Sequence, residues 1–187
     1  MRRDNGNFIC LIAGLVHLIA AAVLLLGLFE KSLYIFYLIS LTVVVGGLLS
    51  VASFLTKSRC RFRPGWLLPQ GLAGIFVGVM MLSALLIGRV SMKDILMFSL
   101  PCIAMITAIL HLSVSFQIKC LGFQRWWILL SFGMIDLIFG VFAYFRFLSE
   151  PFDVITGFGI FFVLLAVQFI AEIVTYKITI DREECDM

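Results

Sequence analysis

Four ionisable side chains lie inside long apolar segments of this chain. They are His17, His111, Asp136 and Glu172. An aspartate at the centre of a bilayer costs about 2.5–3.5 kcal/mol on insertion scales, so a charged group at that depth is a functional hypothesis by default. Histidine changes its charge near neutral pH, and a neighbouring carboxylate favours its protonated form. These residue types point to proton sensing or proton relay.

Two of these residues occupy equivalent positions, each three residues after a glycine. His17 follows Gly14, and Asp136 follows Gly133, while Gly74 holds the same position in a third segment. All three positions fall near the middle of their segments, so we expect them at one depth. Because Gly74 leaves room, the sequence predicts a pair between His17 and Asp136. The pair either senses or relays protons, or is a structural hydrogen bond between two helices.

The other two residues lie closer to the ends of their segments. His111 stands eight residues before Lys119, and Glu172 stands five residues before Lys177. We expect His111 to hydrogen-bond to a neighbouring helix. Glu172 can reach the membrane interface or pair with a nearby cation, because long side chains extend toward the headgroups. Gln168, one helical turn before Glu172, adds polarity to the last apolar segment.

The composition shows which elements must position these residues. The chain of 187 residues is 63% hydrophobic and 13% charged, and its mean hydropathy is +1.14. A soluble domain needs more polar surface than this, whereas a membrane-spanning helix needs about 20 apolar residues. We therefore predict an all-α, polytopic protein in a lipid bilayer, with residues 1–187 as one membrane domain. The six predicted spans are 8–28, 33–56, 66–87, 95–118, 126–145 and 152–176.

Pairs of small residues seven positions apart recur in every second segment. The pairs are Gly14 and Ala21, Gly71 and Gly78, and Gly133 and Gly140. Seven residues make about two helical turns, so each pair lies on one helix face; Gly74 and Gly78 also form a GxxxG. The sequence predicts three repeated helical hairpins over 8–57, 66–119 and 126–177. The small residues either pack these helices together within the chain or form a homo-oligomer contact.

The distribution of basic residues predicts the orientation. Ten of the 14 Lys and Arg residues fall on the side that holds the N-terminus, the second and fourth connections and the tail. Positive residues accumulate in the cytoplasm, so we predict that both termini are cytoplasmic. The tail 178–187 is acidic, and we expect it to be disordered. The formal charge of +3 does not indicate nucleic acid as a partner.

Tryptophans precede two of the glycine pairs. Trp66 stands five residues before Gly71, and Trp127 stands six before Gly133, next to Trp126. We expect these indoles to anchor the helices at the interface. Together with the six spans and the thrice-repeated hairpin, this pattern resembles the HdeD-like acid-resistance membrane proteins. The resemblance implies a bacterial inner-membrane protein linked to acid or envelope stress tolerance, and it supplies no catalytic residue. The first unit departs from the pattern, with Phe8 in place of tryptophan.

The sequence contains no motif for a catalytic or cofactor site. It has no P-loop, HExxH, GxSxG or CxxCH, and its five cysteines include no CxxC. We therefore expect neither an enzyme nor a metal or other cofactor. The main hypothesis is a stress-associated membrane protein that acts by assembly or through a membrane-protein partner. The alternative is a proton or small-solute channel or transporter with a polar pathway near His17 and Asp136.

Overall fold

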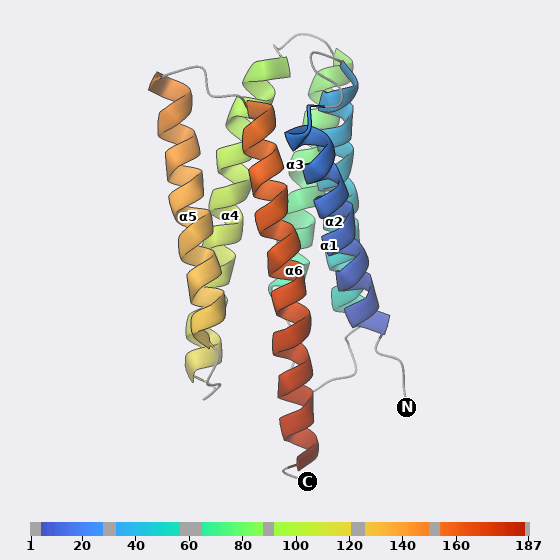
Figure 1. The fold of residues 1–187 in the computed structure, drawn as a ribbon, viewed down its shortest axis with the longest axis vertical. Coiled ribbons are helices and arrows are strands. Elements are labelled where there is room, and N and C mark those ends of the chain that lie inside the picture. Colours follow the sequence, from blue (N-terminus) through green and yellow to red (C-terminus); the bar gives the residue numbers. More distant parts are fainter. Residues whose placement is uncertain are drawn as a thin grey trace.

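The computed structural model of the protein is a bundle of six helices (Figure 1). It describes residues 5–27, 33–56, 65–87, 92–120, 126–149 and 154–185. All six helices are long and apolar enough to cross a membrane, which confirms the predicted all-α architecture. The helices are α1 (Asn5–Leu25), α2 (Leu33–Thr56), α3 (Leu67–Ile87), α4 (Met92–Cys120), α5 (Trp126–Ser149) and α6 (Val154–Cys185).

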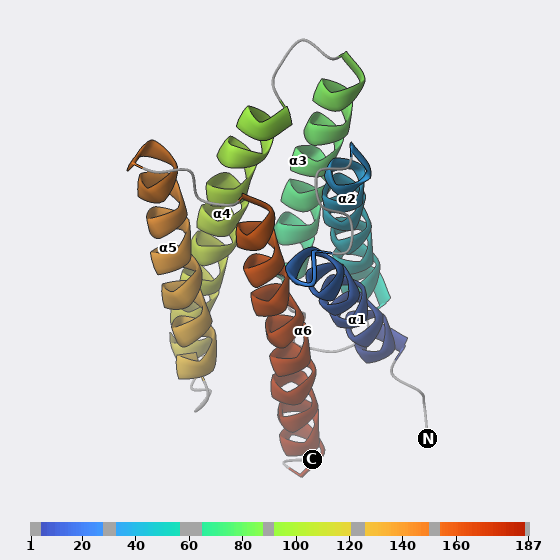
Figure 2. The same cartoon turned by 45° about the horizontal axis from the view of Figure 1, so that its top comes forward.

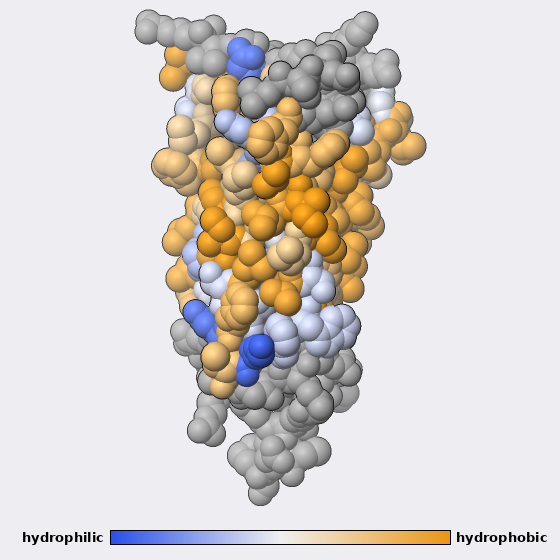
Figure 3. All heavy atoms as spheres, turned by 90° about the vertical axis from the view of Figure 1, so that its left-hand side faces the viewer, coloured by the Kyte–Doolittle hydropathy of each residue, from blue (hydrophilic) through white to orange (hydrophobic). Residues whose placement is uncertain are grey.

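The helices lie in the residue ranges of the apolar runs from which they were predicted. In lipid every backbone polar group must be satisfied within the segment, so a continuous apolar run folds as one helix. Apolar side chains form a broad belt around the middle of the face seen in Figure 3. After α1 the chain turns at Gly27, whose φ of 64° lies in the left-handed region. Only glycine adopts that conformation without strain, so the residue type fixes this turn.

The C-terminal tail differs from its prediction. Residues 178–187 were expected to be disordered, but α6 continues as a helix to Cys185. Figure 1 shows the red end of α6 extending past the other helices. The reason lies in the local sequence, because neither glycine nor proline interrupts the chain between Glu172 and Cys185. A helix that is already nucleated in the bundle adds residues at low cost.

The closest helix pairs are α4 with α5, α2 with α3, and α1 with α6. The pair α1 and α2 packs less closely, and α5 touches α6 only slightly. Figures 1 and 2 both show α5 beside α4, and α6 between that pair and α1. The predicted hairpins join α1 to α2, α3 to α4 and α5 to α6, so this packing does not confirm them as the units of the fold.

The small residues explain why these pairs are close. A Cβ built on Gly71 would lie 2.7 Å from the carbonyl oxygen of Gly47 in α2. One built on Gly133 would lie 2.9 Å from the backbone nitrogen of Leu112 in α4. These glycines therefore let neighbouring backbones approach, which is how helices gain dispersion energy in lipid. The helices that face these glycines belong to the same chain, in agreement with the intramolecular interpretation.

Candidate functional site

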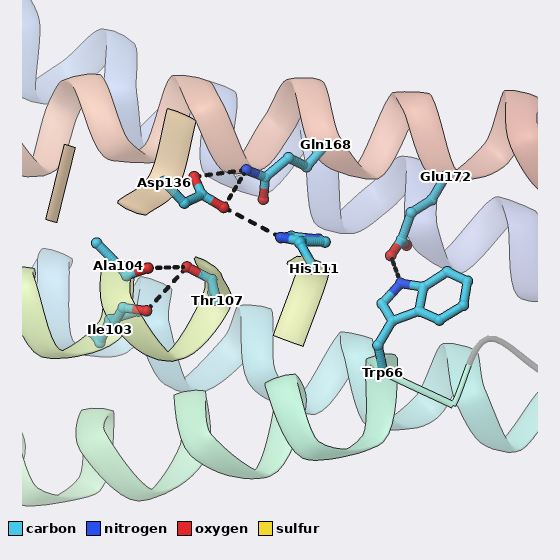
Figure 4. Close-up of polar contacts among 8 residues, drawn as sticks. All are labelled: Trp66, Ile103, Ala104, Thr107, His111, Asp136, Gln168 and Glu172. Carbon is cyan, nitrogen blue, oxygen red and sulfur yellow. Dashed lines mark hydrogen bonds and ion pairs between the residues drawn. The ribbon is translucent and has the colours of Figure 1, made fainter. Parts of the chain in front are cut away.

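A buried carboxylate joins three helices near the middle of the bundle. Asp136 of α5 is 0% exposed, and Gln168 of α6 is 4% exposed. The amide nitrogen Nε2 of Gln168 donates to both carboxylate oxygens of Asp136 at 2.8 Å. His111 of α4, which is 1% exposed, places its Nδ1 3.2 Å from Oδ2 of Asp136. Figure 4 shows all three side chains converging from their helices.

This arrangement corrects the predicted pair between His17 and Asp136. The described partners of Asp136 are His111 and Gln168, whereas His17 bonds to the carbonyl oxygen of Ala13 in its own helix. The packing gives the reason, because α5 lies against α4, and α1 lies against α6 and α2. Equal positions in a repeat set the depth of two residues. They do not set the direction in which each side chain points around its helix.

The cluster has the chemistry to hold one exchangeable proton. An ionised Asp136 only accepts hydrogen bonds, and here the Gln168 amide and the His111 N–H can donate them. Oxygen Oε1 of Gln168 is buried and has no hydrogen-bond partner among the described residues. Rotation of the amide would present Oε1 as an acceptor for a protonated Asp136 carboxyl group. Gln168 can therefore serve both protonation states of the carboxyl.

His17 lies in different surroundings, between α1, α2 and α6. Its ring is 3% exposed and sits 5.5 Å, centroid to centroid, from both Phe162 and Phe169 of α6. On its α2 side the ring fills the space above Gly46, where an added Cβ would lie 2.6 Å from Nε2. The imidazole also lines a small cavity at the centre of the bundle.

Glu172 makes a second buried contact, which its prediction did not include. It is 6% exposed and does not reach outward; its Oε1 accepts a hydrogen bond from the indole nitrogen of Trp66 (Figure 4). The thiol of Cys10 lies 4.0 Å from the other carboxylate oxygen. Trp66 is 7% exposed, and this carboxylate gives its buried indole N–H the acceptor that it needs.

The other two tryptophans have different surroundings. Trp127 is 56% exposed, and Trp126 lies under the ammonium group of Lys119, which is 4.5 Å from its ring centroid. The difference from Trp66 follows from what each indole meets. Trp66 faces a carboxylate of α6, whereas Trp126 meets a cation at the end of α4.

Sequence reasoning assigned the wrong partner to Asp136 and gave Gln168 only a supporting role. A signal existed, since Gln168 is a strongly polar residue in an otherwise apolar run of α6. Such a residue needs a partner in the membrane, and Asp136, His111 and His17 were the ionisable candidates on other helices. Over the described ranges, no three His, Cys, Asp or Glu side chains gather into a group that could hold a metal ion.

The chain was compared with family models, curated proteins and solved structures. No family model, curated protein or solved structure matches it. The assignment of a function therefore depends on the residues and contacts of this chain itself.

Proposed function

We propose that this protein acts in acid or envelope stress tolerance in a bacterial cytoplasmic membrane, as its resemblance to the HdeD-like proteins implies. It acts without catalysis, with both termini in the cytoplasm, by assembly or through a membrane-protein partner. The observation that carries the proposal is the cluster of Asp136, His111 and Gln168. A fully buried carboxylate held by an imidazole and an amide is a group whose bonding changes when a proton arrives.

The position of the cluster gives protonation a structural consequence. Helix α5 packs closely on α4 but touches α6 only slightly, and the bond between Gln168 and Asp136 is part of that slight contact. A proton on the cluster weakens the charge-assisted bonds of the carboxylate. Protonation therefore weakens the contact between α5 and α6, and a partner protein in the membrane can respond to the resulting change in helix packing.

An acid-survival assay tests this proposal. A strain that lacks the gene is complemented with the wild type, with Asp136→Asn or with Asp94→Asn. Asp94 serves as the matched control because it is exposed at the start of α4. We expect the wild type and Asp94→Asn to restore survival, and Asp136→Asn to restore it poorly at equal protein level. Full rescue by Asp136→Asn would exclude the cluster as the proton-responsive element, and a deletion strain without an acid or envelope phenotype would remove the stress role.

The second candidate is a proton or small-solute channel or transporter, and the central cavity beside His17 favours it. Its test is proton flux in proteoliposomes that contain a pH-sensitive dye. We expect flux that falls in the Asp136→Asn variant if the cluster lies on the pathway. Equal proton flux for the wild type, this variant and empty liposomes would reject the proton channel.

A further inference from the structure

A small cavity lies at the centre of the bundle, with walls from α1, α2, α3, α4 and α6. The centres of water-sized molecules can occupy about 40 Å³ of it. One water needs about 10–15 Å³ on this measure, so the cavity has room for a few waters or one molecule of similar total size. Its polar lining consists of His17, Ser50, Gln70 and Thr107.

The imidazole of His17 presents an open acceptor to this cavity. Its Nδ1 lies 2.7 Å from the carbonyl oxygen of Ala13. A carbonyl can only accept, so Nδ1 carries the proton and the neutral ring keeps a lone pair on Nε2. Among the described residues, Nε2 has no hydrogen-bond partner, and it lies over Gly46, which is also part of the cavity wall. A donor that enters the cavity can therefore bond to Nε2.

The two hydroxyl groups of the lining are acceptors as well. Ser50 donates its proton to the carbonyl oxygen of Gly46 at 2.9 Å. Thr107 donates to the carbonyl oxygens of Ile103 and Ala104, at 3.0 and 2.9 Å, as Figure 4 shows. Each hydroxyl donates its only proton to a hydrogen bond within its own helix, so toward the cavity it can only accept. Three of the four polar side chains of the lining therefore offer acceptors to the cavity, and Gln70, the fourth, carries both donors and an acceptor.

The remaining walls exclude a charged ligand. None of the described lining residues is an aspartate, glutamate, lysine or arginine. An ion would lose its hydration there without a counter-charge, which is strongly unfavourable. Phe161, Leu165 and Phe169 instead give apolar contact area on the α6 side, which suits the hydrocarbon part of a ligand.

We propose that this cavity is a binding site for one small, uncharged hydrogen-bond donor of about three or four heavy atoms, held by Nε2 of His17. Primary amides and short alcohols belong to this chemical class. The proposal deepens the second candidate function by naming its solute class, but binding can be measured without transport. If the solute binds but does not cross the bilayer through the protein, the channel is rejected and the binding site stands. If the solute does not bind, the binding site alone is rejected.

The test uses the full-length protein in lipid nanodiscs with ¹⁵N-labelled histidine. The chain has only two histidines, so His17 and His111 give separate ring signals, assigned with a His111→Gln variant. The probes are acetamide and acetone, which have nearly the same size and shape, but only acetamide donates hydrogen bonds. Ammonium chloride is the charged probe. We expect acetamide to shift the Nε2 signal of His17 saturably and to leave His111 unchanged. Acetone should bind about tenfold more weakly, the effect of one missing hydrogen bond.

Two variants locate the site, and saturation-transfer NMR on the ligand measures how well each of them binds acetamide. Thr107→Val should weaken acetamide binding by about threefold to tenfold, because it removes an acceptor and keeps the shape. Thr42→Val is the matched control, since Thr42 makes the same kind of bond to its own helix, at 2.7 Å, and does not line the cavity. Equal binding of acetamide and acetone, tighter binding of ammonium, equal effects of the two variants, or no saturable signal above water would each overturn the proposal.

Discussion

The two histidines of this chain have opposite surroundings. His111 faces the buried carboxyl group of Asp136, which also accepts from Gln168, so its Nδ1 is paired with a side chain of another helix. His17 makes one bond to the backbone of its own helix, is enclosed by phenylalanines and turns its other nitrogen toward a cavity. The first site is a closed polar network that ties helices together. The second offers a hydrogen-bond acceptor to the cavity.

The comparison shows that equal hydropathy and equal residue type do not give equal roles in a membrane. Removing the partner of a histidine in an interhelical network lowers the stability of the protein strongly, because the groups that bonded to that partner stay buried without it. Replacing a histidine that bonds only to its own helix lowers the stability little, because no contact between helices is broken. The expected effects below therefore differ between the two sites, and measured values that do not differ would contradict the comparison.

The largest effect is expected for Asp136→Ala. The change leaves His111 and Gln168 buried without their acceptor, so the free energy of unfolding should fall by about 2–4 kcal/mol. Unfolding by SDS in mixed micelles measures it. Asp94→Ala, at an exposed position, should change the same quantity by less than about 0.5 kcal/mol. Equal losses for the two aspartates would show that the cluster does not stabilise the bundle.

A double-mutant cycle separates the true partner of Asp136 from the one predicted by the repeat. Asp136→Ala combined with His111→Leu should cost about 1–2 kcal/mol less than the sum of the two single changes, because the residues are in contact. Asp136→Ala combined with His17→Leu should be additive, since His17 bonds to Ala13 instead. Coupling with His17 and additivity with His111 would restore the predicted pair and reject the observed one.

Gly46→Ala tests how tightly the ring of His17 is held. The added Cβ would lie 2.4 Å from Cε1 of the ring, so the imidazole must move and the unfolding free energy should fall by about 1–2 kcal/mol. Adding His17→Ala should recover most of this loss. Gly14→Ala is the control, because its Cβ would meet its nearest neighbour at 3.5 Å, an ordinary contact. If the unfolding free energy stays low in the double variant, the strain does not come from contact with the His17 ring.

The smallest effect is expected for His17→Phe. The phenyl ring keeps most of the contact with Phe162 and Phe169, and only the bond to Ala13 is lost. We expect a change in unfolding free energy of about 0.5–1 kcal/mol, close to the value of one hydrogen bond. A loss as large as that of Asp136→Ala, measured in the same micelles, would mean that His17 also belongs to an interhelical network.

Much of the fold could be predicted from residue types alone. The six apolar runs form helices, and except at the C-terminal end of α6 the helix ends lie within a few residues of the predictions, as for α2 at Leu33–Thr56. Length and hydropathy are properties of consecutive residues, so they can be read along the chain. The helical continuation to Cys185 was missed because acidic composition suggested disorder where no helix breaker was present.

The candidate site could be predicted only in part. The sequence identified Asp136, His111 and His17 as polar groups at membrane depth, because their cost in lipid does not depend on the fold. It did not identify their partners. The repeat register suggested that His17 and Asp136 meet, but the close packing of α4 on α5 brings His111 to Asp136.

The sequence by itself determined that this chain forms helices apolar enough to cross a membrane, where those helices run and which side chains are costly in lipid, since each of these depends on local composition. The tertiary structure decided that Asp136 belongs with His111 and Gln168, that Trp66 is buried against Glu172, and that His17 faces a cavity. The physical reason is that contacts between helices depend on which faces pack and how closely backbones approach at glycines such as Gly71 and Gly133. Those distances exist only once all six helices are in place.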